Sequence, residues 1–261
     1  MKIYENILTG PFRLHIICSP YRKKRGHRLC SVLRGKKRRP YREGAMKQTM
    51  KIIVLCTFIL MSLVGVKEAG SGTIDFRELE AEVLKEMNLA RTAPRFYASH
   101  LKESKKYFHG KELRRPGELP VLTKEGVSAL TEAIRFMEKA TPVPKLRLSG
   151  GMSRGARDHV EVQQTTGSVG HGSAEGSRPY ERIGLYGSWE KTVGENIAYG
   201  YAHARDAIIS LIIDDGVPNR GHRQNILNPN FHVVGVACGP HPVYRTMCVI
   251  IFAGRYLEKK D

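Results

Sequence analysis

Apolar side chains recur every three or four residues in four stretches of the chain, which is the spacing of one face of a helix. In the first stretch, Leu79, Val83 and Met87 lie in line behind Asp75, a typical N-cap residue. Pro94 interrupts this pattern before it resumes. The predicted helices are residues 75–101, 124–140, 149–167 and 203–215.

The last part of the chain predicts strands instead. Residues 231–239 and 245–254 are rich in β-branched and aromatic side chains and flank a turn that contains Gly and Pro, which is typical of a hairpin. Cys238 and Cys248 lie nearly symmetrically about that turn, so antiparallel pairing places them opposite one another or one step apart, within reach of a disulfide. Helices followed by strands indicate an α+β fold with an antiparallel sheet.

Two stretches between these elements lack a clear period. Residues 102–121 are charged and contain two prolines, which favours a surface connection. Residues 168–194 are rich in Gly and Ser and contain the single tryptophan, Trp189. The length and composition of this second stretch predict an ordered functional loop rather than a linker.

An uncharged apolar run at residues 52–66 precedes the predicted helices. Its length is below the roughly 20 residues that a membrane-spanning helix needs and matches the core of a secretory signal peptide. Cleavage after Ala69 would place Lys67 where a small residue is expected. Residues 46–69 are therefore predicted to be either a signal peptide or an uncleaved signal anchor, and the protein is expected to be exported.

Most of the net charge of +18 belongs to a basic stretch at the beginning of the chain. Residues 1–51 contribute +13, whereas residues 70–261 contribute only +5. We interpret residues 1–45 as a basic extension that is either disordered or not translated. A nucleic-acid partner would need a basic face on the folded domain. The small charge of that domain gives little support for one, so no nucleic-acid binding is expected.

Candidate functional side chains occur in turns that contain glycine. His171, Glu195 and His222 each follow a glycine directly, and the pair Asp214 and Asp215 precedes one. Two histidines and two acids can bind a divalent metal, with the imidazoles as ligands and the carboxylates behind them. They can also form a buried hydrogen-bonded network without a metal, and spacing alone favours the network. The sequence motifs of serine hydrolases, zinc proteases and P-loop proteins are absent.

Four segments, in their order and spacing, resemble the CAP superfamily, which includes the cysteine-rich secretory proteins, antigen five and plant pathogenesis-related proteins. The segments are "GHGSAEGSRPYERI", "VGENIAYGY", "IISLIIDDGVPNRGHRQNILNPNFHVVGVA" and "VIIFAG". The bacterial SCP-like branch is the most similar, over roughly residues 75–254. The resemblance implies an α-β-α sandwich with a central antiparallel sheet and an open cleft, formed by residues 70–261.

The resemblance also implies a cleft tetrad of two histidines and two acids. His171 lies where the family has the histidine after the central helix, Glu195 lies in its Gly-Glu-Asn motif and His222 in its Gly-His motif. The fourth member in the family is usually a glutamate three residues after a tryptophan. Leu211 stands at that tryptophan position here, so Asp214 is the expected acid and Asp215 the alternative. Because the paired histidines bind zinc in some members, the resemblance implies a labile Zn²⁺ held by His171 and His222.

The functional expectation that follows is a secreted, non-enzymatic module that binds a lipid, a sterol or another extracellular ligand. The alternative is a metal-dependent hydrolase or peptidase that uses Glu195 as general base together with His171 and His222. The expected location is extracellular, periplasmic or at the cell surface, with membrane contact only through an uncleaved signal anchor. His159, on the third predicted helix, is either a core or a cleft residue.

Overall fold

The computed structural model describes residues 74–116, 120–172 and 177–259. The predicted basic extension and the predicted signal segment lie outside the described residues. No helix within the described ranges is both long and apolar enough to cross a membrane.

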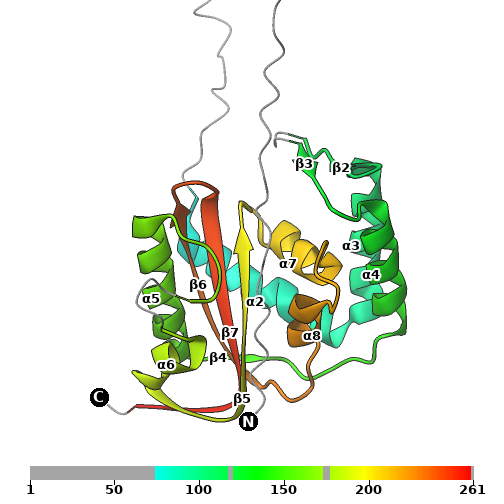
Figure 1. The fold of residues 1–261 in the computed structure, drawn as a ribbon. Helices are drawn as coiled ribbons and strands as arrows, with labels where there is room; N and C mark the ends of the chain where they lie inside the picture. Colours follow the sequence, from blue (N-terminus) through cyan, green and yellow to red (C-terminus); the bar gives the residue numbers. More distant parts are fainter. Residues whose placement is uncertain (1–73, 117–119, 173–176, 260–261) are drawn as a thin grey trace, which may run out of the picture. The chain divides into compact units, whose positions relative to one another are not determined.

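A four-stranded sheet forms the centre of the described domain (Figure 1). Its strand order is β4-β6-β7-β5, with β4 parallel to β6 and the other neighbours antiparallel. β5, which carries the candidate residue Glu195, is therefore an edge strand. The strands are β4 (Arg147–Leu148), β5 (Gly187–Tyr199), β6 (Val233–His241) and β7 (Arg245–Glu258).

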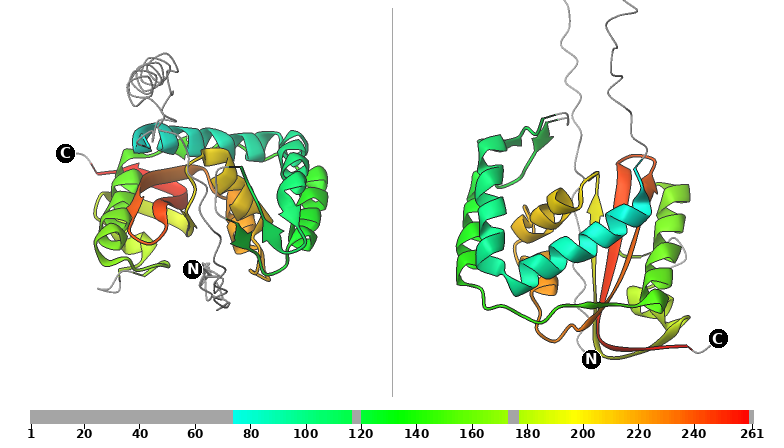
Figure 2. Two further views of the ribbon diagram at one scale, coloured as in Figure 1. Left: turned by 90° about the horizontal axis from the view of Figure 1, so that it is seen from above. Right: turned by 180° about the vertical axis from the view of Figure 1, so that it is seen from behind.

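Helices cover both faces of this sheet, which confirms the expected α+β sandwich (Figures 1 and 2). One face packs against α5 (Gly150–Thr166) and α6 (Pro179–Gly184). The other face packs against α2 (Phe76–Thr92), α7 (Ala204–Ile213) and α8 (Gly221–Ile226), with α3 (Pro94–Ser104) and α4 (Val127–Lys139) beyond them. The remaining elements are η1 (Lys105–Tyr107) and a small antiparallel sheet of β1 (Phe108–His109), β2 (Glu112–Leu113) and β3 (Val121–Leu122).

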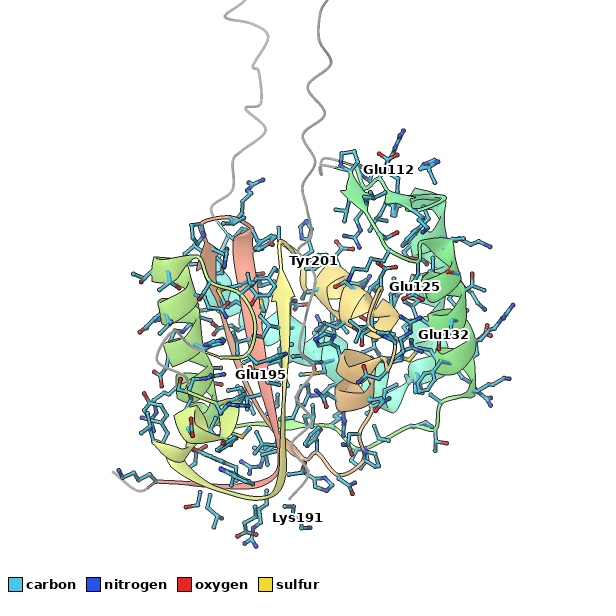
Figure 3. The ribbon with its side chains drawn as sticks, in the orientation of Figure 1. Glu112, Glu125, Glu132, Lys191, Glu195 and Tyr201 are labelled. Carbon is cyan, nitrogen blue, oxygen red and sulfur yellow. A yellow bond between two sulfur atoms is a disulfide. The ribbon has the colours of Figure 1, made fainter. Side chains whose placement is uncertain are left out.

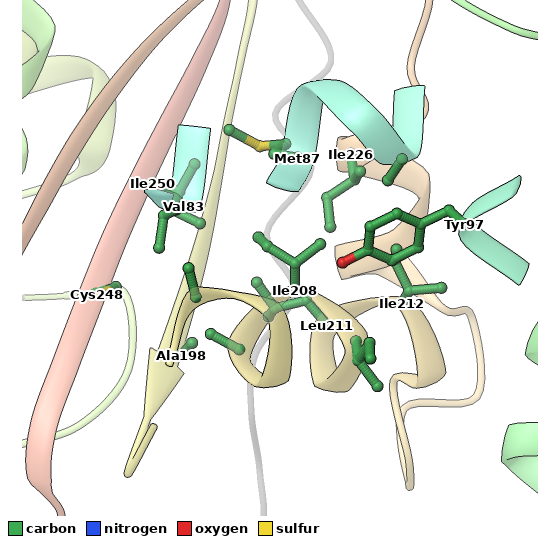
Figure 4. Packing of buried hydrophobic residues seen from close by; sticks show 14 of the residues in the cluster. Val83, Met87, Tyr97, Ala198, Ile208, Leu211, Ile212, Ile226, Cys248 and Ile250 are labelled. Carbon is green, nitrogen blue, oxygen red and sulfur yellow. The ribbon is translucent and has the colours of Figure 1, made fainter. Parts of the chain in front are cut away.

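Two apolar cores result from the alternation of side chains along the strands. Ile250 and Phe252 of β7 face α2 and α7, whereas Val249 and Ile251 face α5. Figure 4 shows part of the first core, where Met87 of α2 packs near Ile208 and Ile226. Apolar residues on both faces of the central strands explain why β6 and β7 are almost entirely buried.

The hairpin and its disulfide are confirmed. Cys238 and Cys248 are direct partners in the β6–β7 register, and their sulfur atoms are bonded at 2.05 Å. Both strands begin or end a few residues beyond the predicted ranges, since β6 reaches His241 and β7 reaches Glu258.

Three sequence predictions need correction. Residues 187–194, expected to be loop, form the first half of β5, because β7 extends far enough to pair with them. Residues 102–121, expected to be a plain surface connection, contain the small sheet. The helix expected to end at Gly216 ends at Ile213, because Asp214 takes a left-handed conformation with φ 55°.

Candidate functional site

The structure brings the four candidate residues together as two histidine–carboxylate pairs. His171 lies in the loop after α5 and contacts Glu195 of β5. His222, in the first turn of α8, contacts Asp214, the residue that ends α7. Each acid is almost fully buried, so each depends on its partners inside the protein to remain charged.

Glu195 is held by one imidazole and one guanidinium group. His171 Nδ1 lies 2.8 Å from Glu195 Oε1, and Arg182 Nη2 donates to Glu195 Oε2. Arg182 Nη1 also donates to the backbone oxygen atoms of His171 (3.2 Å) and Ser177 (2.9 Å). The guanidinium therefore fixes both the acid and the loop that carries the histidine. In Figure 3, Glu195 lies beside β5, away from Glu125 and Glu132 near α4.

The charge balance around Glu195 favours its ionised form. Burial by itself raises the pKa of Glu195, because the charged carboxylate loses hydration. The hydrogen bond from His171 and the charge of Arg182 outweigh that effect, so the pKa of Glu195 lies below its ordinary value. Glu195 is consequently a carboxylate over the whole physiological pH range.

The second pair is equally buried. His222 Nδ1 lies 2.6 Å from Asp214 Oδ1, and the His222 backbone N–H donates to Asp214 Oδ2 at 2.8 Å. Both carboxylate oxygens of Asp214 are thus used by one residue. The left-handed backbone of Asp214 turns the chain at the end of α7 and allows this local contact.

Two asparagines join the pairs across the edge strand. Successive residues of a strand point to opposite faces, so Glu195 faces α6 while Asn196 faces α8. Asn196 Nδ2 donates to the backbone oxygen of His222 at 2.9 Å. Asn225 Nδ2 lies within hydrogen-bonding distance of Asn196 Oδ1 and of the backbone oxygen of Glu195. The pairs therefore flank β5 and share one hydrogen-bonded frame.

Gly194 explains how α8 can lie so close to β5. A Cβ atom at this position would lie 2.9 Å from Phe231 Cζ and 3.1 Å from Asn225 Oδ1. Only glycine leaves room for the asparagine bridge.

Asp215, the alternative acid, has a different role. Its carboxylate accepts hydrogen bonds from the backbone N–H groups of Lys124 (2.6 Å), Glu125 (2.8 Å) and Gly126 (3.2 Å). These residues directly precede α4. Asp215 therefore anchors the beginning of α4, and the structure assigns the contact with His222 to Asp214.

Neighbouring substitutions separate these two roles. We expect Asp215→Ala to lower the free energy of unfolding by about 1–2 kcal/mol, because three backbone donors lose their acceptor. Asp214→Ala removes the hydrogen-bond partner of His222, so Zn²⁺, the ion that the family resemblance implies, should bind that ring about tenfold more weakly than in the wild type. Denaturant unfolding and Zn²⁺ calorimetry of both variants test this. The assignment would be contradicted if Asp215→Ala bound Zn²⁺ more weakly than the wild type while Asp214→Ala kept the wild-type affinity.

Sequence reasoning missed Arg182. Arg223, which follows His222 directly, is 1 % exposed and donates to both carboxylate oxygens of Glu132. Arg220 forms two hydrogen bonds of 2.7 Å with Glu125 and lowers the pKa of that acid to about 2. The sequence signal for Arg182 was indirect: a carboxylate in a buried strand requires a cationic partner.

His159 is a buried residue close to the first pair. Its Nε2 atom lies 2.8 Å from the backbone oxygen of Gly170, directly before His171. Burial, together with the charge of Arg182, lowers the pKa of His159. The ring is therefore neutral at physiological pH, a core histidine that contacts the loop of the candidate site.

The free ring nitrogens determine what the site can bind. Within the described residues, Nε2 of His171 and Nε2 of His222 are buried and have no hydrogen-bond partner. No group of three or more His, Cys, Asp or Glu side chains arranged for a metal occurs in that part of the chain. An unpaired imidazole nitrogen is chemically suited to ligate a divalent cation, and these two donors alone do not make a closed structural zinc site, which has four protein ligands.

Comparison with known proteins identifies the family of this fold. The family described as "CAP: Cysteine-rich secretory protein family" matches residues 86–252. The chain belongs to this family.

Its relatives include bacterial proteins. YkwD of Bacillus subtilis (strain 168) is 31% identical over 110 residues, which are 42% of this chain and 40% of YkwD. The chain thus matches less than half the length of this curated relative.

Solved structures of similar proteins match about the same share of this chain as YkwD does. An extracellular protein with an SCP domain from Bacillus anthracis is 23% identical over 42% of this chain and 34% of its own, with a TM-score of 0.35. An outer surface protein from Borrelia burgdorferi is 16% identical over 43% of this chain and 80% of its own, with a TM-score of 0.38.

Proposed function

We propose that this protein is an exported binding module in which His171, Glu195, Asp214 and His222 organise the ligand site. One observation carries the proposal: each histidine places Nδ1 on a buried carboxylate and leaves a buried Nε2 atom without a partner. Two such rings on either side of an edge strand are a pair of preorganised ligand donors.

The carboxylates select the tautomer of both rings. An ionised carboxylate only accepts hydrogen bonds, so in each neutral ring Nδ1 carries the proton and Nε2 keeps its lone pair. This arrangement is the one that metal-binding histidines use, with a carboxylate fixing the ring from behind. His171 and His222 would therefore hold Zn²⁺, and the bound ion would supply a local positive charge and a Lewis acid for an oxygen-containing ligand.

The same geometry favours binding over hydrolysis. A general base must reach and accept a proton, but His171 and Arg182 engage the two oxygens of Glu195 and lower its pKa. A catalytic zinc also normally has three protein ligands, whereas two imidazoles are offered here. The hydrolase with Glu195 as general base remains the second candidate, supported by the open ring nitrogens.

The ligand class comes from the family to which the chain belongs. A lipid or a sterol is the first candidate, and another small or extended extracellular molecule is the second. Export is supported by the apolar run at residues 52–66 and by the disulfide of β6 and β7, since disulfides persist in oxidising compartments. The net charge of +5 on residues 70–261 gives little support for a nucleic-acid partner.

Zinc titration of the exported protein tests the core of the proposal. Calorimetry should show saturable Zn²⁺ binding that disappears in the His171→Ala/His222→Ala double variant. A second double variant, His203→Ala/His232→Ala, removes two exposed histidines and should bind Zn²⁺ as the wild type does. Equal binding in all three proteins, or no binding in the wild type, would contradict the metal site.

Two further measurements separate the functional classes. Saturable uptake of a radiolabelled sterol or fatty acid by the exported protein would support the binding module. Hydrolysis of a peptide library by the wild type, lost in Glu195→Gln, would instead establish the second candidate. Absence of uptake combined with Glu195-dependent hydrolysis would reject the proposed binding function.

A further inference from the structure

The loop that carries His171 is held by side chains from four other elements. His241 of β6 has Nε2 3.1 Å from the backbone oxygen of Ser168. Gly170 and the backbone oxygen of His171 are contacted by residues of α5, β5 and α6. Loops usually run over the surface with few such restraints, so this concentration of contacts directly before a candidate ligand calls for a physical explanation.

The contacts to Gly170 form a closed cycle. The Gly170 backbone N–H donates to Tyr199 Oη at 2.9 Å, and the Tyr199 hydroxyl donates to Gln163 Oε1 at 2.8 Å. The Gln163 side-chain amide then donates to the backbone oxygen of Gly170 at 2.6 Å. Each of these three bonds pairs a donor with an acceptor, so both backbone groups of Gly170 are satisfied by two side chains from α5 and β5. The Gln163 amide nitrogen also lies 2.8 Å from His159 Nε2.

Packing restrains the two side chains of the cycle. Gln163 is fully buried, and the rings of Tyr199, His241 and Tyr244 form a cluster in which the Tyr199 centroid lies 5.5 Å from that of His241 and 5.4 Å from that of Tyr244. Gly170 has φ 97°, a conformation that L side chains rarely adopt. Burial raises the pKa of Tyr199 to about 12, so its hydroxyl keeps the proton that it donates to Gln163.

We propose that Tyr199 and Gln163, supported by His159, are positioning residues that set the orientation of the His171 ring on Glu195. By holding both backbone groups of Gly170, they fix the residue immediately before His171. The ring is then presented with Nδ1 on Glu195 and Nε2 toward the ligand. This inference rests on the proposed function, because it assigns these residues to the same site.

Replacing Tyr199 by phenylalanine tests the proposal directly. Tyr199→Phe keeps the ring but leaves the Gly170 N–H and the Gln163 amide oxygen without their partner. In the metal-free protein, ¹⁵N-detected NMR of the histidine rings should show His171 changing from a single Nδ1-protonated tautomer to a mixture. His222 should keep its tautomer and serves as an internal reference, because its contacts to Asp214 do not involve the loop. Zn²⁺ affinity should fall about tenfold, as for other residues that orient a metal ligand.

Tyr244→Phe is the matched control. Tyr244 belongs to the aromatic cluster of Tyr199 and His241. In the described structure its hydroxyl makes none of the hydrogen bonds of the Gly170 cycle. This variant should leave both the His171 tautomer and the Zn²⁺ affinity unchanged. If Tyr244→Phe changed the His171 tautomer as much as Tyr199→Phe does, the proposal would be overturned, because the aromatic cluster and not the hydrogen-bond cycle would then be responsible.

The NMR measurement separates this inference from the metal site. If the wild type binds no Zn²⁺ but Tyr199→Phe shifts the His171 tautomer, the positioning role stands and the metal proposal fails. If His171 keeps a single Nδ1-protonated tautomer in Tyr199→Phe, the positioning role is overturned whatever the metal does. Gln163→Met removes the other side chain of the cycle and should reproduce the tautomer shift. Unfolding of both variants would assign the cycle to the stability of the fold and overturn the inference.

Discussion

Replacing Arg91 by methionine should lower the free energy of unfolding by about 4 kcal/mol. Arg91 has no exposed surface, and its guanidinium donates to four backbone oxygens, those of Pro144 (2.8 Å), Ile226 (2.6 Å), Asn228 (3.1 Å) and Phe231 (2.9 Å). Methionine fills part of the volume but donates no hydrogen bond. Each buried carbonyl left without a donor costs about 1–3 kcal/mol, reduced where water or relaxation replaces it.

Arg91 also affects the site, because one of these oxygens belongs to Ile226, the last residue of α8, and two belong to the segment that follows α8. Burial lowers the pKa of Arg91 to about 10, so the guanidinium is charged at neutral pH and attracts carbonyl dipoles from two separate segments. The chain after α8 is thereby held against α2, and with it the helix that presents His222. If His222 ligates Zn²⁺ as we propose, loss of Arg91 should therefore weaken Zn²⁺ binding as well as stability.

Denaturant unfolding checks this prediction. Arg95→Met is the control, because Arg95 is exposed and donates to one backbone oxygen, that of Glu138; it should change the unfolding free energy by at most about 0.5 kcal/mol. Equal stability of the two variants would show that the carbonyl cluster does not depend on Arg91.

Elements with local signals were predicted well from the sequence. Asp75 accepts hydrogen bonds from the backbone N–H groups of Arg77 and Glu78, as expected of an N-cap. The apolar line of α5 and the cysteine pair of the hairpin also follow the predicted pattern. In each case the residues that determine the structure lie within one or two turns of one another or symmetrically about one tight turn.

β5 could not be predicted because its cause is distant in sequence. Residues 187–194 are rich in polar and Gly residues and look like loop, yet they pair with the end of β7, about sixty residues later. A bulge with a left-handed Lys191 interrupts the alternation further. Tertiary pairing overrides local propensity at this position, and the pairing partner is not visible in a single sequence.

In the candidate site, too, local sequence signals predicted some residues, whereas others depended on tertiary contacts. Glycine-flanked acids and histidines, together with the family resemblance, led to His171, Glu195, Asp214 and His222, which the structure joins in pairs. The choice between Asp214 and Asp215 required the backbone conformation at the end of α7. Arg182 required knowledge of which side chain reaches a buried carboxylate, and that depends on the packing of α6 against β5.

The second large effect is expected at this buried ion pair. Glu195→Gln should lower the free energy of unfolding by about 3 kcal/mol, because it leaves the Arg182 guanidinium, whose side chain is 4 % exposed, without its counter-charge. The exposed pair of Lys85 and Glu82 provides a matched control. Glu82→Gln should cost at most about 0.5 kcal/mol, since both side chains are well hydrated.

A double-mutant cycle isolates the pair from the other contacts of Arg182. Arg182→Met also removes donors to the His171 and Ser177 backbone oxygens, so its own cost exceeds that of the ion pair. The losses of unfolding free energy in the two single variants, Arg182→Met and Glu195→Gln, should sum to more than the loss in the double variant. The expected coupling free energy is about 2 kcal/mol. Additive losses would mean that the two side chains stabilise the fold independently.

The pH dependence of the unfolding free energy provides a second, independent test of this ion pair. Because folding lowers the pKa of Glu195, the unfolded chain binds its proton first as the solution is acidified. The contribution of Glu195 is therefore fully present above about pH 4.3, the ordinary glutamate value, and is lost as the pH falls through the folded pKa. The stability difference between wild type and Glu195→Gln should shrink below that pH. A difference that stays constant down to strongly acidic conditions would show that the carboxylate charge is not what holds Arg182 and the His171 loop in place.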